Sequence, residues 1–343
     1  MITIIHLLNT NSFSGAENVA INIIKNMNNI YNYNCIYIAL KGPIEKKLVE
    51  NDIPYYLVEK IDKKTLELID RKFQPSIYHC HDFTTSVLCA LSFKNKKIIS
   101  HLHNNPSWIK KRNIKSIIYG MCINKYQYVL AVSNSIFKEY IYANKIKKKE
   151  VISNPIKKID TNKISKIDEY CDILFLGRLT KQKDPIRFIK IIHKLKHDKK
   201  DITAFMIGDG ELREECLEEI HKLKCEENIK LLGFKENRFD YINNSKILCV
   251  PSLWEGFGLV AIEALSFGKP VVCSGVGGLI DIVNSDCGAI CKSDEEYCDE
   301  ILKLLTDQDY YNSKKEKSYN RIKNIENYSS YYKKLDYIYR EIL

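Results

Sequence analysis

Two carboxylates flank a glycine-rich turn in the segment 250–265. Glu255 precedes Gly256 and Gly258, and Glu263 follows them where apolar residues recur at helical spacing. The glycines let the backbone approach a ligand closely, and free N–H groups at a helix start favour a phosphate or a polar sugar edge. This arrangement suits a ligand with phosphates in its middle and hydroxyl groups at both ends, which is the layout of a nucleotide-sugar.

Two cations share a second loop. Arg178 and Lys183 lie between an apolar run, 173–176, and Pro185, near which a helix begins. Together they can hold a diphosphate and neutralise the charge that develops on it as it departs. A solvent-facing position is the plainer interpretation of either cation alone, but the pair on one loop favours a binding role.

Two pairs of histidines end apolar runs, His79 with His81 and His101 with His103. Strand alternation places the members of each pair on one face of a sheet. A metal site is one interpretation, but we favour a polar lining in which a single histidine hydrogen-bonds a substrate. We expect that residue to be His103, because the loop-forming sequence 104–106 follows it.

Glycines after two other apolar runs give weaker indications. Gly15 opens a helical segment, where the backbone can approach a pyrophosphate. Gly233 and Phe234 end a later run and can present backbone to a nucleobase. The dinucleotide fingerprint G-x-G-x-x-G is absent, which argues against a hydride-transfer enzyme.

Alternating strands and helices must position these residues. In the first half we predict strands over 2–8, 35–40, 55–58, 77–80, 97–100 and 128–132, and helices over 15–27, 44–50, 64–73, 84–91, 114–123 and 135–142. In the second half we predict strands over 173–176, 204–207, 229–231, 247–250 and 270–273, and helices over 185–195, 212–223, 259–267, 295–305 and 328–343. Such alternation indicates parallel sheets that are covered on both faces.

A polar segment, 156–169, interrupts this alternation and has the character of an interdomain linker. We therefore predict an α/β protein with two doubly wound domains. The first comprises residues 1–155 with the C-terminal helix 326–343, and the second comprises residues 170–325. The carboxyl ends of the strands, and hence the loops that carry the candidate residues, are expected to face a shared cleft.

The charge of the chain is uneven. The 343 residues are 45% hydrophobic and 28% charged, which is typical of a globular protein, and the net charge is +10. Residues 1–160 hold 24 basic against 12 acidic side chains, whereas residues 161–343 hold 29 against 31. Besides solvated surface, the basic half favours an anionic partner such as membrane lipid or a lipid-phosphate acceptor. No nucleic-acid motif is present, so we expect no nucleic-acid partner.

The twelve cysteines are scattered without a C-x-x-C pair, which predicts reduced thiols and no zinc site. No signal peptide is recognisable, and no apolar run approaches the roughly 20 residues that span a bilayer. We therefore expect a cytoplasmic protein, located at the inner face of the membrane if its acceptor is lipid-linked.

Five motifs occur in order at suitable separations: Gly15-Ala16-Glu17, His103, Gly177-Arg178 with Lys183, Gly208-Asp209-Gly210, and Glu255-x7-Glu263. In these motifs the chain resembles the retaining glycosyltransferases of family four (group 1). The resemblance implies the GT-B fold, which has two Rossmann-like domains and a C-terminal helix that crosses back to the first. It spans nearly the whole chain, and its most specific element is the E-x7-E pattern.

The resemblance also implies roles for the matched residues. The ribose would be bound by Glu263, the donor-sugar hydroxyls by Glu255, and the donor sugar and distal phosphate by the backbone at Phe257, Gly258 and Leu259. Arg178 and Lys183 would bind the diphosphate, Gly15 would approach it from the first domain, and His103 would touch the donor sugar near its reacting carbon. We expect the catalytic step to depend on His103, Arg178, Lys183 and Glu255.

Three residues depart from the family pattern. Ser14 replaces the first of two consecutive glycines, and Asp184 stands where asparagine or glycine is frequent. His101 lies two residues before His103, so it is a second candidate for the catalytic histidine.

We therefore expect a retaining glycosyltransferase of the hexosyl or N-acetylhexosaminyl type. It would move a sugar from a nucleotide-sugar, a UDP-sugar above others, to a glycan or lipid-linked glycan in the synthesis of a surface polysaccharide such as capsule or lipopolysaccharide. Because Arg178, Lys183 and helix dipoles can carry the phosphate charge, no metal or other cofactor is expected. The alternatives are a nucleotide-sugar epimerase or a phosphorylase of the same fold, and a non-catalytic glycan-binding protein.

Overall fold

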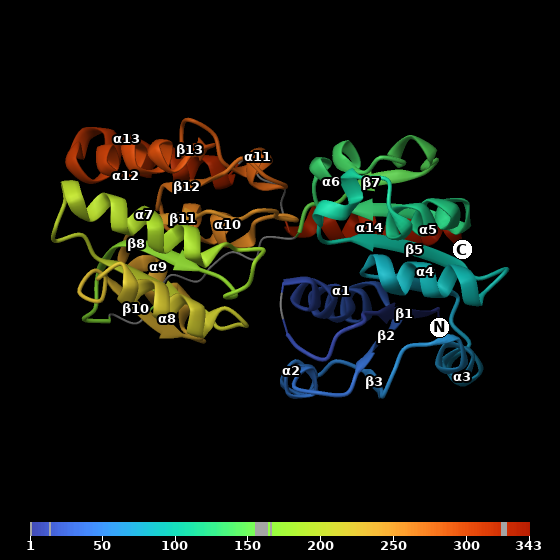
Figure 1. Cartoon of the computed structure of the whole chain (residues 1–343). Coiled ribbons are helices and arrows are strands. Elements are labelled where there is room, and N and C mark those ends of the chain that lie inside the picture. The colour runs from blue at the N-terminus through green and yellow to red at the C-terminus, as the bar shows by residue number, and fades with distance from the viewer. Residues whose placement is uncertain (1, 14, 155–163, 165–166, 324–327) are drawn as a thin grey trace. The chain divides into compact units, whose positions relative to one another are not determined.

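The computed structural model describes residues 2–13, 15–154, 164, 167–323 and 328–343. The chain divides into two compact units (Figure 1), residues 1–156 with 326–343 and residues 157–325. Ser14 and most of the expected linker, 155–163 and 165–166, lie outside the described residues.

The first unit is built on a parallel sheet in the order β3-β2-β1-β4-β5-β6-β7. Its strands are β1 (Thr3–Leu7), β2 (Asn34–Leu40), β3 (Tyr55–Val58), β4 (Ile77–Cys80), β5 (Lys97–Leu102), β6 (Tyr126–Ala131) and β7 (Lys149–Val151). Its α-helices are α1 (Gly15–Tyr31), α2 (Ile44–Glu50), α3 (Lys63–Phe73), α4 (Phe83–Ser92), α5 (Ile114–Cys122), α6 (Asn134–Glu139) and α14 (Tyr328–Ile342), with 3-10 turns η1 (Ser107–Lys110), η2 (Ile123–Lys125) and η3 (Ala143–Lys145).

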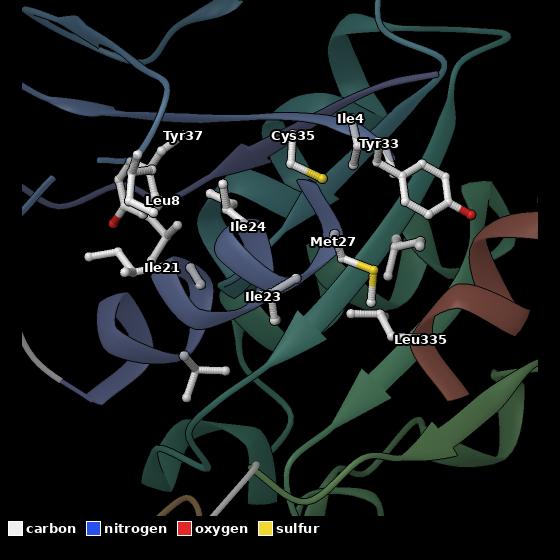
Figure 2. Close-up of a cluster of buried hydrophobic side chains, with 14 of the residues drawn as sticks. Ile4, Leu8, Ile21, Ile23, Ile24, Met27, Tyr33, Cys35, Tyr37 and Leu335 are labelled. Carbon is white, nitrogen blue, oxygen red and sulfur yellow. The ribbon is translucent and has the colours of Figure 1, made fainter. Parts of the chain in front are cut away.

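The C-terminal helix α14 belongs to the core of this unit. Its residues Tyr331, Leu335, Ile338 and Tyr339 recur at helical spacing and are buried. They join a cluster with apolar side chains of α1 and the neighbouring strands, and Figure 2 shows Leu335 together with the α1 side chains. The C-terminal segment therefore returns to the first unit, as the fold predicted from the resemblance requires.

The second unit has a parallel sheet in the order β10-β9-β8-β11-β12-β13. Its strands are β8 (Cys171–Leu176), β9 (Ala204–Ile207), β10 (Ile229–Gly233), β11 (Ser245–Val250), β12 (Val271–Ser274) and β13 (Gly288–Cys291). Its helices are α7 (Pro185–Asp198), α8 (Arg213–Lys222), α9 (Arg238–Asn243), α10 (Leu259–Ser266), α11 (Leu279–Ile282), α12 (Asp294–Thr306) and α13 (Gln308–Lys323).

The predicted class, two parallel α/β sheets with helices between the strands, is confirmed. The predicted strands and helices are present, with ends that move by a few residues; α6, for example, stops at Glu139 because Tyr140 is extended. Elements β7, β13, α9, α11 and α13 were not predicted. All twelve cysteines are free thiols, as expected, and all of them are buried. None of the helices in the described ranges is long and apolar enough to cross a membrane.

Candidate functional site

In the second unit the candidate residues gather where the strand order reverses. Strand β8 has β9 on one side and β11 on the other, and the connection after β8 leads to β9 whereas the connection after β11 leads to β12, in the opposite direction along the sheet. A crevice at the carboxyl ends of such strands is the usual ligand site of an open α/β sheet. Two connections begin there, the β8–α7 loop (177–184) and the β11–α10 turn (251–258), and they carry Lys183 and Glu255.

Gln182 ties these two connections together. The Leu253 N–H donates to the Gln182 carbonyl oxygen at 2.9 Å, and the Gln182 side-chain amide donates to the Trp254 carbonyl at 3.1 Å. The backbone that precedes Glu255 is therefore held against the backbone that precedes Lys183. Sequence reasoning missed Gln182, because a glutamine in a polar loop carries no pattern of its own.

Lys183 and Glu255 form an ion pair through the lysine Nζ and the glutamate Oε2. Their side chains are only 15% and 11% exposed. A Cβ atom on Gly177 would lie 3.4 Å from the Lys183 Cγ, so the lysine stem lies directly over this glycine. The pair thus sets a cation and a carboxylate side by side in a largely desolvated position, where each charge acts more strongly than in water.

Two glycines shape the turn that presents Glu255. Gly258 has φ +92° and forms the N-cap of α10, with no side chain capping the helix. The Ala261 N–H donates to the Gly258 carbonyl at 3.0 Å, so the N–H groups that a ligand can use at this helix start are those of Leu259 and Val260. Gly277, after β12, has φ +56°, and a Cβ there would lie 1.5 Å from the Glu255 carbonyl oxygen. The sequence prediction did not include Gly277, although glycines of this kind, which let the backbone turn closely, are frequent just after parallel strands.

Glu263 of α10 is held by a residue that was not predicted. Arg238 of α9 donates from Nε to Oε2 at 3.2 Å and from Nη2 to Oε1 at 2.9 Å. Burial opposes the charged form of Arg238, but the hydrogen bonds and charge of Glu263 outweigh burial and raise the arginine pKa. The Glu263 carboxylate is therefore oriented by two hydrogen bonds on one side.

Three other residues singled out in this unit are Arg178, Phe234 and Asp184, and among the residues that the structure describes no hydrogen bond or ion pair joins any of them to the Lys183–Glu255 pair. Arg178 is exposed, and no ion pair or side-chain hydrogen bond is found for it in the described part of the chain. Phe234 follows β10, which β9 and β8 separate from β11, and its side chain is 69% exposed. Asp184 has φ +49°, a left-handed conformation that explains why asparagine or glycine suits this position.

In the first unit the strand order reverses at β1, which lies between β2 and β4. Gly15 opens α1 just beyond β1 and is exposed. His103 follows β5 and is half-buried, whereas His101 lies within β5 and is fully buried, so His103 is the more accessible of the two candidates. Burial lowers the pKa of His103 to about 3, which keeps its imidazole neutral at pH 7.

His103 belongs to a larger group of imidazoles. Two sets of three, His6 with His79 and His81, and His81 with His101 and His103, bring nitrogen atoms within 4.8 Å of one another, as a metal site would require. The sequence prediction included four of these histidines and missed His6. His6 occupies the same face of β1 that His79 occupies on β4, because the two residues are in register.

Two family models match adjacent parts of the chain. The model described as Glycosyltransferase Family 4 matches residues 14–158, and the model described as Glycosyl transferases group 1 matches residues 157–321. Anabaena HepE, solved in complex with UDP-glucose, superposes with a TM-score of 0.87 over 99% of this chain and 100% of its own, at 17% sequence identity. The GT-B fold is thereby confirmed.

The curated relatives match this chain over only part of its length and part of their own. An uncharacterised glycosyltransferase of Methanocaldococcus jannaschii is 28% identical over 68% of this chain, and the match covers 65% of that protein's length. The match to a second uncharacterised glycosyltransferase of the same organism covers 66% of that protein's length. A Campylobacter jejuni α-1,4-N-acetyl-D-galactosaminyltransferase, named for an acceptor glycan on PP-undecaprenol, is 31% identical over 54% of this chain and 51% of its own length.

Proposed function

Because the chain belongs to the group 1 glycosyltransferases of family four, we propose that it transfers a sugar from a nucleotide-sugar donor to a glycan acceptor with retention of anomeric configuration. The observation that carries this proposal is the Lys183–Glu255 pair at the strand-order reversal of the second unit, on two connections that Gln182 holds together. A cation and a carboxylate fixed side by side suit a ligand with a phosphate next to sugar hydroxyls.

Each matched residue has a task in this reaction. As the bond between the sugar and the diphosphate breaks, negative charge grows on the departing phosphate. Lys183 and Arg178, with the uncapped start of α10, are placed on connections from which they can stabilise that charge. Glu255 accepts hydrogen bonds from the sugar hydroxyls and orients the donor. These groups supply the charge stabilisation that a metal would otherwise provide, so the proposed reaction needs no metal and no cofactor.

We further propose a uridine nucleotide as donor. Glu263, oriented by Arg238, offers its carboxylate to the ribose hydroxyls. Phe234, an exposed aromatic side chain beyond Gly233, suits stacking on a base. The complex of HepE with UDP-glucose supports this choice, because HepE shares the fold of this chain.

The proposed acceptor is a lipid-linked glycan in surface polysaccharide synthesis at the cytoplasmic face of a membrane. The Campylobacter relative named for a PP-undecaprenol-linked acceptor supports it. So does a surface of α5, on which Ile114 and Met121 are 73% and 76% exposed and Ile118 is 38% exposed. Lys111, Arg112 and Lys115 are exposed beside this stripe. We call these six residues the α5 surface; apolar and basic groups together suit an anionic bilayer.

The products of the reaction test the proposal. The purified chain is incubated with single UDP-sugars, a lipid-linked glycan acceptor and EDTA. Transfer releases UDP and lengthens the acceptor, with the anomeric configuration of the donor kept in the new bond. An altered sugar that remains on UDP would indicate an epimerase, and a sugar phosphate would indicate a phosphorylase. Glycan binding without turnover of any nucleotide-sugar would indicate a binding protein, and loss of transfer in EDTA would refute metal independence.

A further inference from the structure

Five of the eight histidines lie together in the first unit. They follow the alternation of three adjacent strands, where Ile4, Ile77 and Ile99 join the hydrophobic cluster and His6, His79 and His101 come two residues later on the same face. His81 and His103 continue this face beyond β4 and β5. His6, His79, His81 and His101 are at most 1% exposed.

The five imidazoles form two hydrogen-bonded lines. In one line, His6 Nδ1 and His81 Nε2 are 2.9 Å apart, and His81 Nδ1 and His103 Nε2 are 2.9 Å apart. In the other, the Tyr339 hydroxyl lies 2.6 Å from His79 Nδ1, and His79 Nε2 lies 3.1 Å from His101 Nδ1. The lines stack on each other, with the rings of His79 and His81 4.3 Å apart and 7° from parallel.

These distances fit hydrogen bonds better than metal ligation. Two nitrogens on one tetrahedral zinc lie about 3.4 Å apart when each Zn–N bond is about 2.1 Å long. The nitrogens within each line are 2.9–3.1 Å apart, and each bond joins a ring nitrogen of one histidine to the facing nitrogen of the next. The nearly parallel rings of His79 and His81 also direct their in-plane lone pairs alongside each other instead of toward one point.

The line His6–His81–His103 has a fixed number of protons. Burial lowers the pKa of His6 and of His103 to about 3 and lowers that of His81 as well, so all three rings are neutral at pH 7. A neutral imidazole has one N–H and one acceptor nitrogen. Two of the three N–H groups make the two internal bonds, and one N–H is left over. The three rings must therefore share one tautomer, all Nδ1–H or all Nε2–H.

The two tautomers place the remaining N–H at opposite ends. All-Nε2–H puts it on His6 Nε2, and all-Nδ1–H puts it on His103 Nδ1; neither nitrogen has a partner among the described residues. His6 lies in a central strand at 0% exposure, where an unpaired N–H would cost about 1–3 kcal/mol. His103 Nδ1 is buried as well, but His103 lies past the end of β5, at the edge of the sheet where ligands of open α/β folds bind, so a ligand oxygen can accept its hydrogen bond.

We propose that His6 and His81 are positioning residues that fix His103 in the Nδ1–H tautomer, so that it presents a hydrogen-bond donor to an oxygen of the bound substrate. His103 then donates and does not act as a base, since its other nitrogen already accepts from His81. The proposal rests on the proposed function only in taking that oxygen to belong to the donor sugar.

The test is ¹⁵N NMR of the intact chain with labelled histidines, at pH 7.5 without ligand. We expect His6, His81 and His103 all to carry hydrogen on Nδ1. In His6→Asn the side-chain amide can either donate to His81 Nε2 or accept from it, so the all-Nε2–H arrangement no longer leaves a buried N–H unpaired and His103 should populate both tautomers. The kcat for sugar transfer should then fall about tenfold while the donor KM changes less than about twofold. Tyr339→Phe is the matched control: it removes a hydrogen bond from the other line, and His103 and kcat should stay unchanged.

Three results would overturn the coupling: Nε2–H on the three histidines, different tautomers within the line, or one equivalent of added Zn²⁺ bound by the wild type but not by His6→Phe. If His6→Asn does not fold, His6→Phe serves instead. There the all-Nε2–H arrangement would leave the buried His81 Nε2–H unpaired, so His103 should keep Nδ1–H, and loss of the single tautomer in His6→Phe would overturn the argument. Three Nδ1–H tautomers in a chain that transfers no sugar would refute the proposed function and leave the coupling intact.

Discussion

At the scale of single residues, the site depends on charges that are paired before any donor binds. Lys183 meets Glu255, and Glu263 meets Arg238, so each proposed binding group is already oriented by an opposite charge. Because the first pair is largely buried, removing either partner leaves the other charge without compensation. Arg178 differs, since its exposed side chain can move to a phosphate when the donor arrives.

Lys183→Ala should lower kcat by about 10²–10³-fold, the loss expected when one group that stabilises transition-state charge is removed. The measurement is the rate of UDP release in the presence of acceptor. Lys181→Ala is the matched control, because Lys181 is an exposed lysine of the same loop. Equal rates for the two variants would remove Lys183 from the mechanism.

Glu263→Ala should weaken UDP binding by roughly ten- to 150-fold, since a hydrogen bond to a charged group contributes about 1.5–3 kcal/mol. Arg238→Met leaves the carboxylate in place without its partner and should weaken binding by about fivefold or less. Calorimetric titration with UDP measures both. If UDP bound to Glu263→Ala as tightly as to the wild type, the ribose assignment would be wrong.

At the scale of elements, glycines between strands and helices control where the binding groups point. Gly277 can approach the Glu255 carbonyl only because it has no side chain, and its φ of +56° is one that other residues adopt at a cost. The backbone at Gly277, after β12, therefore packs directly against the backbone at Glu255 in the turn after β11. This contact joins two stretches that are 22 residues apart in the sequence, Glu255 and Gly277.

Gly277→Ala should abolish most sugar transfer and lower the melting temperature. Gly268→Ala provides the control, since Gly268 has φ +66° and a Cβ there would meet the Tyr319 ring at 2.5 Å, away from the Glu255 turn. Both variants should lose stability in a thermal melt, but Gly268→Ala should keep its activity when assayed while folded. Comparable activity losses in the two variants would contradict a specific role for Gly277.

The strands that a sequence predicts well are apolar runs such as Ile247–Val250, whose burial leaves little choice of structure. The elements that escaped prediction lack such a signal. Strand β13 is a four-residue run, and helix α13 has the sequence QDYYNSKKEKSYNRIK, in which charged and polar residues surround the helix. Tertiary contacts, such as the Ser318 hydroxyl with the Cys287 carbonyl at 3.5 Å, contribute to fixing α13 and cannot be inferred from local pattern.

The candidate site divides in the same way. Glu255, Glu263 and Lys183 stand in motifs whose spacing implies chemistry, so the sequence predicted them as site residues. Arg238 and Gln182 are single polar residues in loops or at a helix start, and only the fold shows what they contact. His6 could have been predicted only in part. It follows Ile4 by two residues, as His79 follows Ile77, but no second histidine lies two residues further along to draw attention to it.

At the scale of the whole molecule, the buried histidines make stability depend on pH. The unfolded chain binds protons below about pH 6.5, whereas His6 in the folded chain resists protonation until about pH 3. The unfolded state therefore gains stability as pH falls through this window, and His6 alone costs about 2 kcal/mol at pH 5. We expect the melting temperature to fall between pH 7.5 and 5, and His6→Phe to reduce that fall. A melting temperature independent of pH over this range would contradict neutral burial.

The α5 surface predicts binding to anionic membranes. Replacing Lys111, Arg112 and Lys115 together with glutamine should weaken binding to phosphatidylglycerol vesicles by about 100-fold, at about 1 kcal/mol per cation. Vesicle sedimentation measures it. The control replaces Lys63, Lys64 and Arg71 of α3, which are exposed cations of the same unit. Equal losses in the two variants would indicate that net charge, and not the α5 surface, governs binding.

The most direct test of the account is a calorimetric titration of the intact wild-type chain with UDP and a panel of UDP-sugars in EDTA. The second unit is proposed to contain a complete nucleotide site built from Lys183, Glu255 and Glu263. We therefore predict that UDP binds one site per chain without a metal and that one of the UDP-sugars binds there in competition with UDP. A chain that binds neither UDP nor any nucleotide-sugar would contradict the central claim.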